Sequence, residues 1–190
     1  GKVKEDDSGG VHTRRVTFAS GQTLDTRAND GTGVVIPAGT VSSNTTVEIV
    51  LVGVNTNDAN GSAQGQASID ANRRVSLEND PELSQMLTIT IPYPDADQNG
   101  VVDGTSVPEM SLTVHWYDLV FGQWKKAFSS TVFPDDNYVQ ATVHHLTEFG
   151  VFGISRAIDF RTSEEAWIPL GIVDSFLVTT NKGASWNLSP

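Results

Sequence analysis

The feature that most constrains the fold of this chain is a strand-like alternation along most of its length. Short alternating or β-branched runs are separated by Gly, Asn, Asp and Pro, as at Ala28–Gly31 and Pro134–Asn137. Turn signals spaced by about eight to twelve residues predict a sandwich or a barrel. The strands that we predict are Thr13–Phe18, Gly33–Ile36, Thr46–Val52, Arg73–Leu77, Leu87–Ile91, Ser111–Tyr117, Gln123–Phe128, Tyr138–Val143 and Glu148–Ile154.

The same pattern suggests how the chain is divided. Residues 1–10 are polar and rich in Gly and Asp, and we expect a flexible leader there. Residues 11–155 carry the strand pattern and form the main domain, while residues 156–190 differ in pattern and form an extension. We expect short helical pieces, of about one turn each, at Pro81–Gln85 and Ser163–Trp167. The polar stretch Asn55–Gln66 is interpreted as a surface loop.

The stretch DADQNGVVD, residues 95–103, predicts a cation site. It places oxygen-bearing side chains at alternating positions, and Gly100 stands where a tight turn needs a positive φ. Calcium prefers about six to eight oxygen ligands, and without a cation the carboxylates of such a loop repel one another. The calcium ligands that we predict are the side chains of Asp95, Asp97, Asn99 and Asp103 and the main-chain carbonyl of Val101. A solvated acidic turn is the alternative.

Composition excludes several classes of function. The net charge of −11 disfavours nucleic acid and anionic membrane surfaces as partners, because both need a basic face. No apolar run is long enough to span a membrane. Cysteine is absent, so disulfides, thiolate metal sites and a cysteine nucleophile are excluded. The histidines lack zinc-site spacing, and no hydrolase elbow or phosphate-binding glycine loop occurs.

Four segments in order resemble one family. They are GVVIPAGTVSSNTTVEIVLV (residues 33–52), LTITIPYPDADQNGVVDG (87–104), SLTVHWYDLVFGQWKKAFSS (111–130) and HHLTEFGVFG (144–153). Together they resemble the ZU-five β-sandwich domain of ankyrins and netrin receptors, in the form found in bacterial surface proteins. The resemblance covers residues 11–154 and implies an Ig-like antiparallel β-sandwich used as an extracellular or linking module. Gly150 departs from the family, in which a bulkier residue is common.

The tripeptide His145-Leu146-Thr147 resembles the self-cleavage sequence of autoproteolytic receptor domains. In that chemistry Thr147 would attack the carbonyl of Leu146, and His145 would act as the base. The step also needs a strained peptide bond and a group that stabilises the oxyanion. The structural alternative is a closing strand whose His and Thr form local hydrogen bonds.

Aromatic residues on a predicted hairpin suggest a further alternative. Trp116 and Tyr117 precede the turn and Trp124 follows it. Alternation places Trp116 and Tyr117 on opposite faces of the strand. Exposed rings could stack on sugars and form a carbohydrate-binding module, whereas buried rings would be cross-strand packing pairs.

The tail contains TTNKGASW, residues 179–186, which resembles the Asp-box hairpin with Asn181 in the Asp position. A single copy predicts a hairpin around Asn181–Gly183 and no glycosidase activity.

These observations predict a non-enzymatic, calcium-stabilised module with a structural or adhesive role. We expect it to belong to a secreted or surface-anchored bacterial protein. The sequence would then be a mature form or part of a longer chain. A lipid anchor, if there is one, would be attached to a residue outside this sequence. The expected partners are other surface proteins or further copies of itself. Copies would join by adding a strand to an exposed sheet edge. A glycan is the alternative partner. Self-cleavage between Leu146 and Thr147 is the enzymatic alternative.

Overall fold

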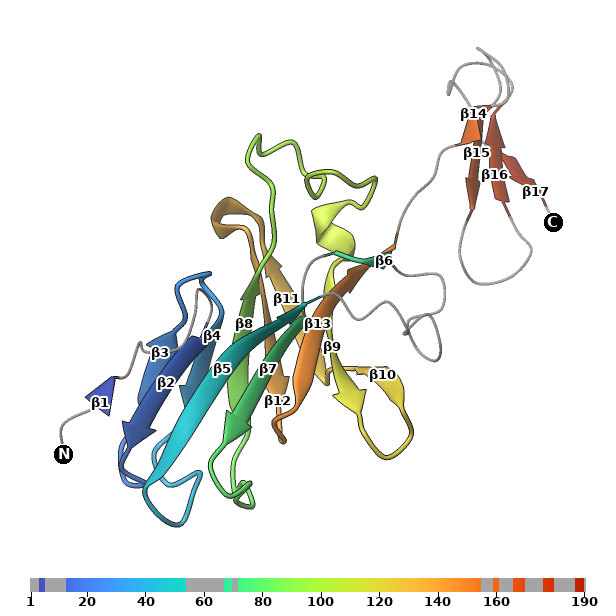
Figure 1. Ribbon diagram of the computed structural model, residues 1–190. Coiled ribbons are helices and arrows are strands. Elements are labelled where there is room, and N and C mark those ends of the chain that lie inside the picture. The colour runs from blue at the N-terminus through green and yellow to red at the C-terminus, as the bar shows by residue number, and fades with distance from the viewer. Residues whose placement is uncertain are drawn as a thin grey trace.

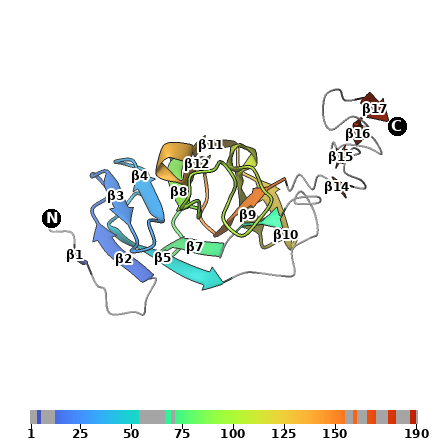
Figure 2. The ribbon, with the colours of Figure 1, turned by 90° about the horizontal axis from the view of Figure 1, so that it is seen from above.

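The computed structural model (Figure 1) describes residues 4–5, 13–53, 67–69, 72–154, 159–160, 166–169, 176–179 and 187–189. Its main part is an antiparallel β-sandwich, which confirms the predicted all-β fold class. Two sheets pack face to face, and Figure 2 shows them as separate layers. All strand pairs are antiparallel. They are joined by turns or by longer loops, without crossover helices in the described part of the chain.

The first sheet contains eight strands. Its order is β1 (Lys4–Glu5), β2 (Thr13–Phe18), β5 (Thr45–Gly53), β7 (Asn72–Leu77), β13 (Glu148–Gly153), β9 (Thr113–Asp118) and β10 (Gln123–Lys126), with β6 (Ala67–Ser68) paired to β13. The strands β2 and β13 run in opposite directions, and the register places Thr13, at the start of β2, level with Glu148, at the start of β13.

The second sheet contains five strands. Its order is β11 (Ser129–Phe133), β12 (Tyr138–Val143), β8 (Leu87–Pro92), β4 (Gly33–Ile36) and β3 (Leu24–Arg27). A separate four-stranded sheet contains β14 (Asp159–Phe160), β15 (Ala166–Pro169), β16 (Phe176–Thr179) and β17 (Asn187–Ser189). The strands β16 and β17 pair across residues 180–186, where we predict the Asp-box-like turn, but those residues lie outside the described part.

The core forms between the two sheets because many strands place apolar side chains at every second position, although β8 and β13 have continuous buried runs. In β12, for example, Val139, Ala141 and Val143 are buried, while the residues between them are half-exposed. Phe149 of β13 and Ile89 of β8 are completely buried and belong to the same core cluster. Each sheet therefore turns one apolar face inward, as the alternation predicts.

All nine predicted strands are present, but four further strands of the two sheets escaped prediction. These are the two-residue strands β1 and β6 and the longer strands β3 and β11. The predicted strand Gln123–Phe128 is too long, because β10 ends at Lys126 and the chain crosses to the second sheet. The crossing is fixed by Val114, whose carbonyl accepts a hydrogen bond from Ala127 N (2.9 Å) and whose amide donates one to Ser130 Oγ (3.0 Å).

The predicted helical pieces are wrong where the structure describes them. Residues 81–85 form no helix; their conformation is fixed by Ser84, whose hydroxyl donates to Gly39 O (2.8 Å). Ala166 and Trp167 belong to β15, and residues 163–165 lie outside the described part. The helical elements of the described residues are two short 3-10 turns, η1 (Glu109–Ser111) and η2 (Pro134–Asp136). The loop expected at residues 55–66 and most of the leader also lie outside it.

A buried ion pair connects the two sheets. Arg73 of β7 reaches the β3–β4 turn, where its Nε lies 3.2 Å from Asp30 Oδ2 and 3.1 Å from Thr32 Oγ1. The side chains of Arg73 and Asp30 are only 4% and 14% exposed. Thr32 also donates its amide and its hydroxyl to the Asp30 carboxylate, at 3.0 and 2.9 Å. The carboxylate is therefore fully compensated, both by charge and by hydrogen bonds.

Candidate functional site

The predicted cation loop lies in the connection between β8 and η1, at one end of the sandwich (Figure 1). Asn137, which follows η2, fixes the start of the loop. Its side-chain amide donates to Asp95 O (2.8 Å), and its carbonyl accepts from Tyr93 N (2.9 Å). Asp103 N donates to Pro94 O (2.8 Å) and closes the loop on itself. The loop is thus hydrogen-bonded to the residue that precedes β12 and to Pro94 at its own start.

Three of the predicted ligands converge. Asp95, Asp97 and Asp103 each offer a carboxylate oxygen, and these oxygens all lie within 4.8 Å of one another. Asp95 is buried, with 2% exposure, whereas Asp97 and Asp103 are exposed. Gly100 has φ +79°, as the spacing predicts. The sequence pattern therefore folds into a local cluster of negative charge.

In the structure the side chain of Asn99 is held within the loop. Asn99 Oδ1 accepts a hydrogen bond from Val101 N (2.8 Å), as in an Asx turn, and Asn99 Nδ2 donates to Asp97 Oδ2 (2.8 Å). Because an amide oxygen has two lone pairs, Asn99 Oδ1 can serve as a ligand while it accepts this bond. The Val101 carbonyl stays a predicted ligand, and the three carboxylates, whose oxygens converge, are the stronger part of the predicted set.

Sequence reasoning missed a fourth carboxylate beside this cluster. Glu109 in η1 is 8% exposed, and its Oε2 accepts a hydrogen bond from Tyr93 Oη (2.8 Å). Its amide donates to Gly100 O (3.0 Å), so η1 is fastened to the loop. Burial, the hydrogen bond to Glu109 and the charges of Glu109 and Asp95 raise the pKa of Tyr93 above its usual value. Glu109 lies outside the alternating pattern, so only the fold brings it to the loop.

No described side chain neutralises these acids. The ion pairs that join described residues are Arg73–Asp30 and Lys125–Asp118, and neither includes a carboxylate of the loop. Backbone amides of the loop donate hydrogen bonds to all three carboxylates, but they bring no positive charge. A cation from solution could supply that charge, because carboxylate oxygens are ligands of hard cations such as calcium.

The structure gives the residues of the predicted self-cleavage sequence separate partners. Leu146 and Thr147 lie in the connection between β12 and β13, and Thr147 Oγ1 donates to Tyr117 O (3.0 Å). The ring of His145 packs against Trp116, with centroids 4.1 Å apart, and its buried Nε2 has no hydrogen-bond partner. Burial and the neighbouring His144 lower the pKa of His145. The structure thus pairs the hydroxyl with a carbonyl of β9 instead of a base.

Of the three hairpin aromatics, Trp124 is buried, whereas Trp116 and Tyr117 are half-exposed. Trp116 packs toward the main core, and Tyr117 lies on the opposite face, as alternation predicts. Trp124 is completely buried between Tyr117 and Phe152, with centroid distances of 5.3 and 5.2 Å. This second aromatic cluster explains Gly150. A Cβ there would lie 2.9 Å from the Phe152 ring and 2.8 Å from Asn72 Oδ1, so a larger residue would collide with the cluster.

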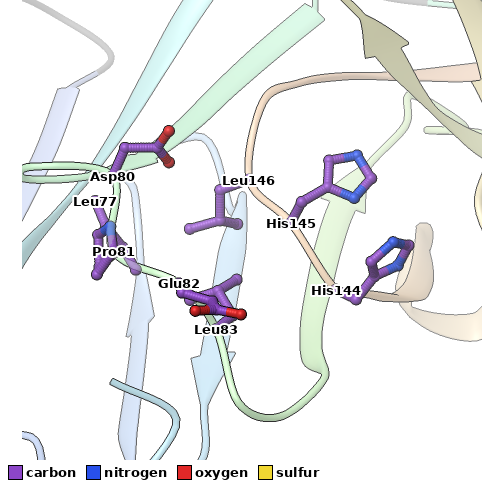
Figure 3. Close-up of a pocket in the computed structure, with 8 residues that line it drawn as sticks. All are labelled: Leu77, Asp80, Pro81, Glu82, Leu83, His144, His145 and Leu146. Carbon is purple, nitrogen blue, oxygen red and sulfur yellow. The ribbon is translucent and has the colours of Figure 1, made fainter. Parts of the chain in front are cut away.

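A shallow groove of about 390 Å³ lies at the other end of the sandwich (Figure 3). Leu77, Leu83 and Leu146 contribute apolar side chains, and Asp80 and Glu82 contribute carboxylates. Figure 3 shows that the rings of His144 and His145, which also line the groove, point to the side opposite Asp80. The two histidines and the two acids therefore do not converge on a metal position.

Comparison with known proteins adds no relative from which a function could be transferred. The sequence matches no known protein family, and no curated protein is significantly similar to it. The resemblance to the ZU-five domain therefore stays a prediction. Among the described residues, no helix is long and apolar enough to cross a bilayer.

Proposed function

We propose that this chain is a non-enzymatic, calcium-stabilised β-sandwich module of a secreted or surface-anchored bacterial protein. Its role is structural or adhesive, alongside other surface proteins or neighbouring copies. The observation that carries the proposal is the convergence of Asp95, Asp97 and Asp103 within 4.8 Å, without a cationic side chain among the described residues to compensate them.

The position of the cluster supports a stabilising role. The loop is hydrogen-bonded to Asn137 beside β12 and to Glu109 in η1, so it connects the second sheet to the approach to β9 in the first. An ion that bridges the carboxylates would order about fifteen residues of connection without touching the core. Stabilisation then follows by mass action, because the unfolded chain does not present the ligands together.

The chemistry of the site also agrees with an extracellular location. Three carboxylates, two of them exposed, form a weak and open set of ligands. Extracellular calcium modules typically bind with dissociation constants of about 10⁻⁴ to 10⁻³ M, which is the range that such a set supports. A site of this strength would be filled outside cells and largely empty inside them.

Calorimetry with calcium and with a chelator tests the proposal. We expect calcium to raise the melting temperature, with about 2.7 kcal/mol of stabilisation at a hundredfold excess over the dissociation constant. The double variant Asp97→Asn/Asp103→Asn should lose this shift. The matched control Asp135→Asn/Asp136→Asn removes two acids from η2, outside the cluster, and should keep it. Identical melting curves of the unmodified protein in calcium and chelator would contradict the proposal.

A further inference from the structure

The β9–β10 hairpin ends in an apolar tip, which we define as Leu119, Val120 and Phe121. Their side chains are 80%, 86% and 69% exposed. Within the described part of the chain this is the only run of three exposed large apolar residues. Such runs are unfavourable in a soluble domain unless a partner covers them.

The tip is held rigidly. Asp118 Oδ1 accepts hydrogen bonds from Val120 N (2.9 Å) and Phe121 N (3.2 Å), and Asp118 O accepts one from Gly122 N (2.7 Å). Lys125 Nζ lies 2.6 Å from Asp118 Oδ2 and 4.4 Å from the centroid of the Phe121 ring. The apolar side chains are therefore displayed in a fixed arrangement, which lowers the entropic cost of binding.

A complementary groove adjoins the tip on the same molecule. The groove of Figure 3 shares Leu77, Asp80 and Leu146 with a second hollow of about 330 Å³, and Leu119 of the tip lines that hollow. We call the two together the leucine groove. Leucines line it together with polar side chains. Its charged residues are the acids Asp80, Glu82 and Glu148 and one base, Arg74, so acids predominate.

The charges of the two surfaces are opposite. Lys125 and Lys126 of β10 are the only lysines between residues 13 and 154, in a chain with a net charge of −11. Lys125 is paired with Asp118, whereas Lys126 is exposed. The apolar tip thus adjoins a strand that carries two lysines. Beside it lies the leucine groove, in which acidic side chains predominate.

We propose that the apolar tip docks into the leucine groove of a second copy of this chain and forms a symmetric dimer. Because the tip and the groove lie on one face, a two-fold axis between them places each tip in the partner's groove. The contact then closes on itself and does not propagate into a filament. Lys126 of each copy lies near the acidic side chains of the other's groove. The hairpin tip and the calcium loop lie at opposite ends of the sandwich (Figure 1), so dimerisation does not depend on the proposed calcium site.

Analytical ultracentrifugation over a range of protein concentrations, in calcium and in chelator, tests the proposal. We expect a monomer–dimer equilibrium in both. The variant Val120→Gln/Phe121→Gln should weaken it by about tenfold or more, because central aromatic anchors dominate binding. The matched control Met110→Gln/Phe128→Gln removes two equally exposed apolar side chains elsewhere and should not weaken it. Both sets of changes affect exposed side chains, and circular dichroism verifies folding.

A charge exchange provides the second arm. Lys126→Glu or Glu82→Lys alone should weaken the dimer, and the double variant should recover most of the loss. A protein that remains monomeric at every concentration overturns the proposal. A dimer whose affinity the tip variant leaves unchanged also overturns it. Binding of the monomer to phosphatidylcholine vesicles that depends on the tip overturns it too, because the partner would then be a lipid surface.

Discussion

Two acidic sites in this molecule differ in how their charge is compensated. Asp30 is buried against Arg73 and receives two further hydrogen bonds from Thr32. Asp95, Asp97 and Asp103 lie within 4.8 Å of one another without a described basic partner. The first site contains its own cation, whereas the second depends on solvent and hydrogen bonds. The difference teaches that one acidic chain contains a charge site that is compensated internally and another that is not, and our proposal of an external ion concerns only the second.

The largest effect should come from removing the cation of the internally compensated site. Arg73→Met leaves Asp30 buried without its partner, which should cost about 3–5 kcal/mol of unfolding free energy. Urea denaturation measures the loss. Arg74→Met, on the same strand but exposed, is the matched control and should change stability by less than about 0.5 kcal/mol. Equal effects of the two changes would show that the ion pair is not important for stability.

The second-largest effect should come from His115, a buried histidine that lowers the stability of the fold when it is protonated. His115 is 1% exposed, and burial lowers its pKa from 6.5 to about 4, while a hydrogen bond that the ring donates to the backbone of Thr113 acts in the opposite direction. The unfolded chain therefore binds one more proton between pH 6.5 and 4. Stability should fall as pH falls through this window, by about 1.4 kcal/mol per pH unit and about 3 kcal/mol in total.

Chemical denaturation at several pH values checks this dependence. His115→Phe should remove that part of the slope, and His144→Gln, at an exposed histidine, should keep it. A slope that His115→Phe leaves unchanged would mean that His115 is not the group responsible.

The smallest effect concerns the uncompensated site and should have the opposite sign to that of Arg73→Met. In chelator, Asp103→Asn removes one of three repelling charges and keeps an oxygen that can accept the hydrogen bond from Ala96 N. We expect a gain of about 0.5 kcal/mol, the usual size of like-charge effects between exposed groups. In calcium the same change should lose stability relative to the unmodified protein. Paired melts in chelator and calcium measure the change of sign, and a loss in both would contradict the comparison.

The sequence predicts the sandwich well because its signal is local. Alternation over four to nine residues identifies the strands, and the carboxylates of the loop are recognisable because they lie within nine residues of one another. The strand β3 escaped because its sequence, LDTR, has one large apolar residue, whereas the equally short β4 reads GVVI. The strand β11 escaped because it follows β10 without a turn signal.

The features that sequence reasoning missed depend on contacts between distant residues. Arg73 and Asp30 are 43 positions apart, and no pattern marks them as a pair. Glu109 reaches Tyr93 over 16 positions through a connection of irregular backbone. The position of Trp124 under Phe152 follows from the pairing of β9 with β10 and β13, so the burial of its ring could not be read from the hairpin alone.

The register of β2 and β13 has a mechanical consequence. Because Thr13 is level with Glu148, the end of β13 lies beyond the start of β2, and β5 and β7 separate the two strands. A force applied between the start of β2 and the end of β13 therefore acts partly along the strands and loads their hydrogen bonds in shear. The hairpin tip projects from the end of the sheet opposite to the end of β13, so its surface stays outside the path of the force.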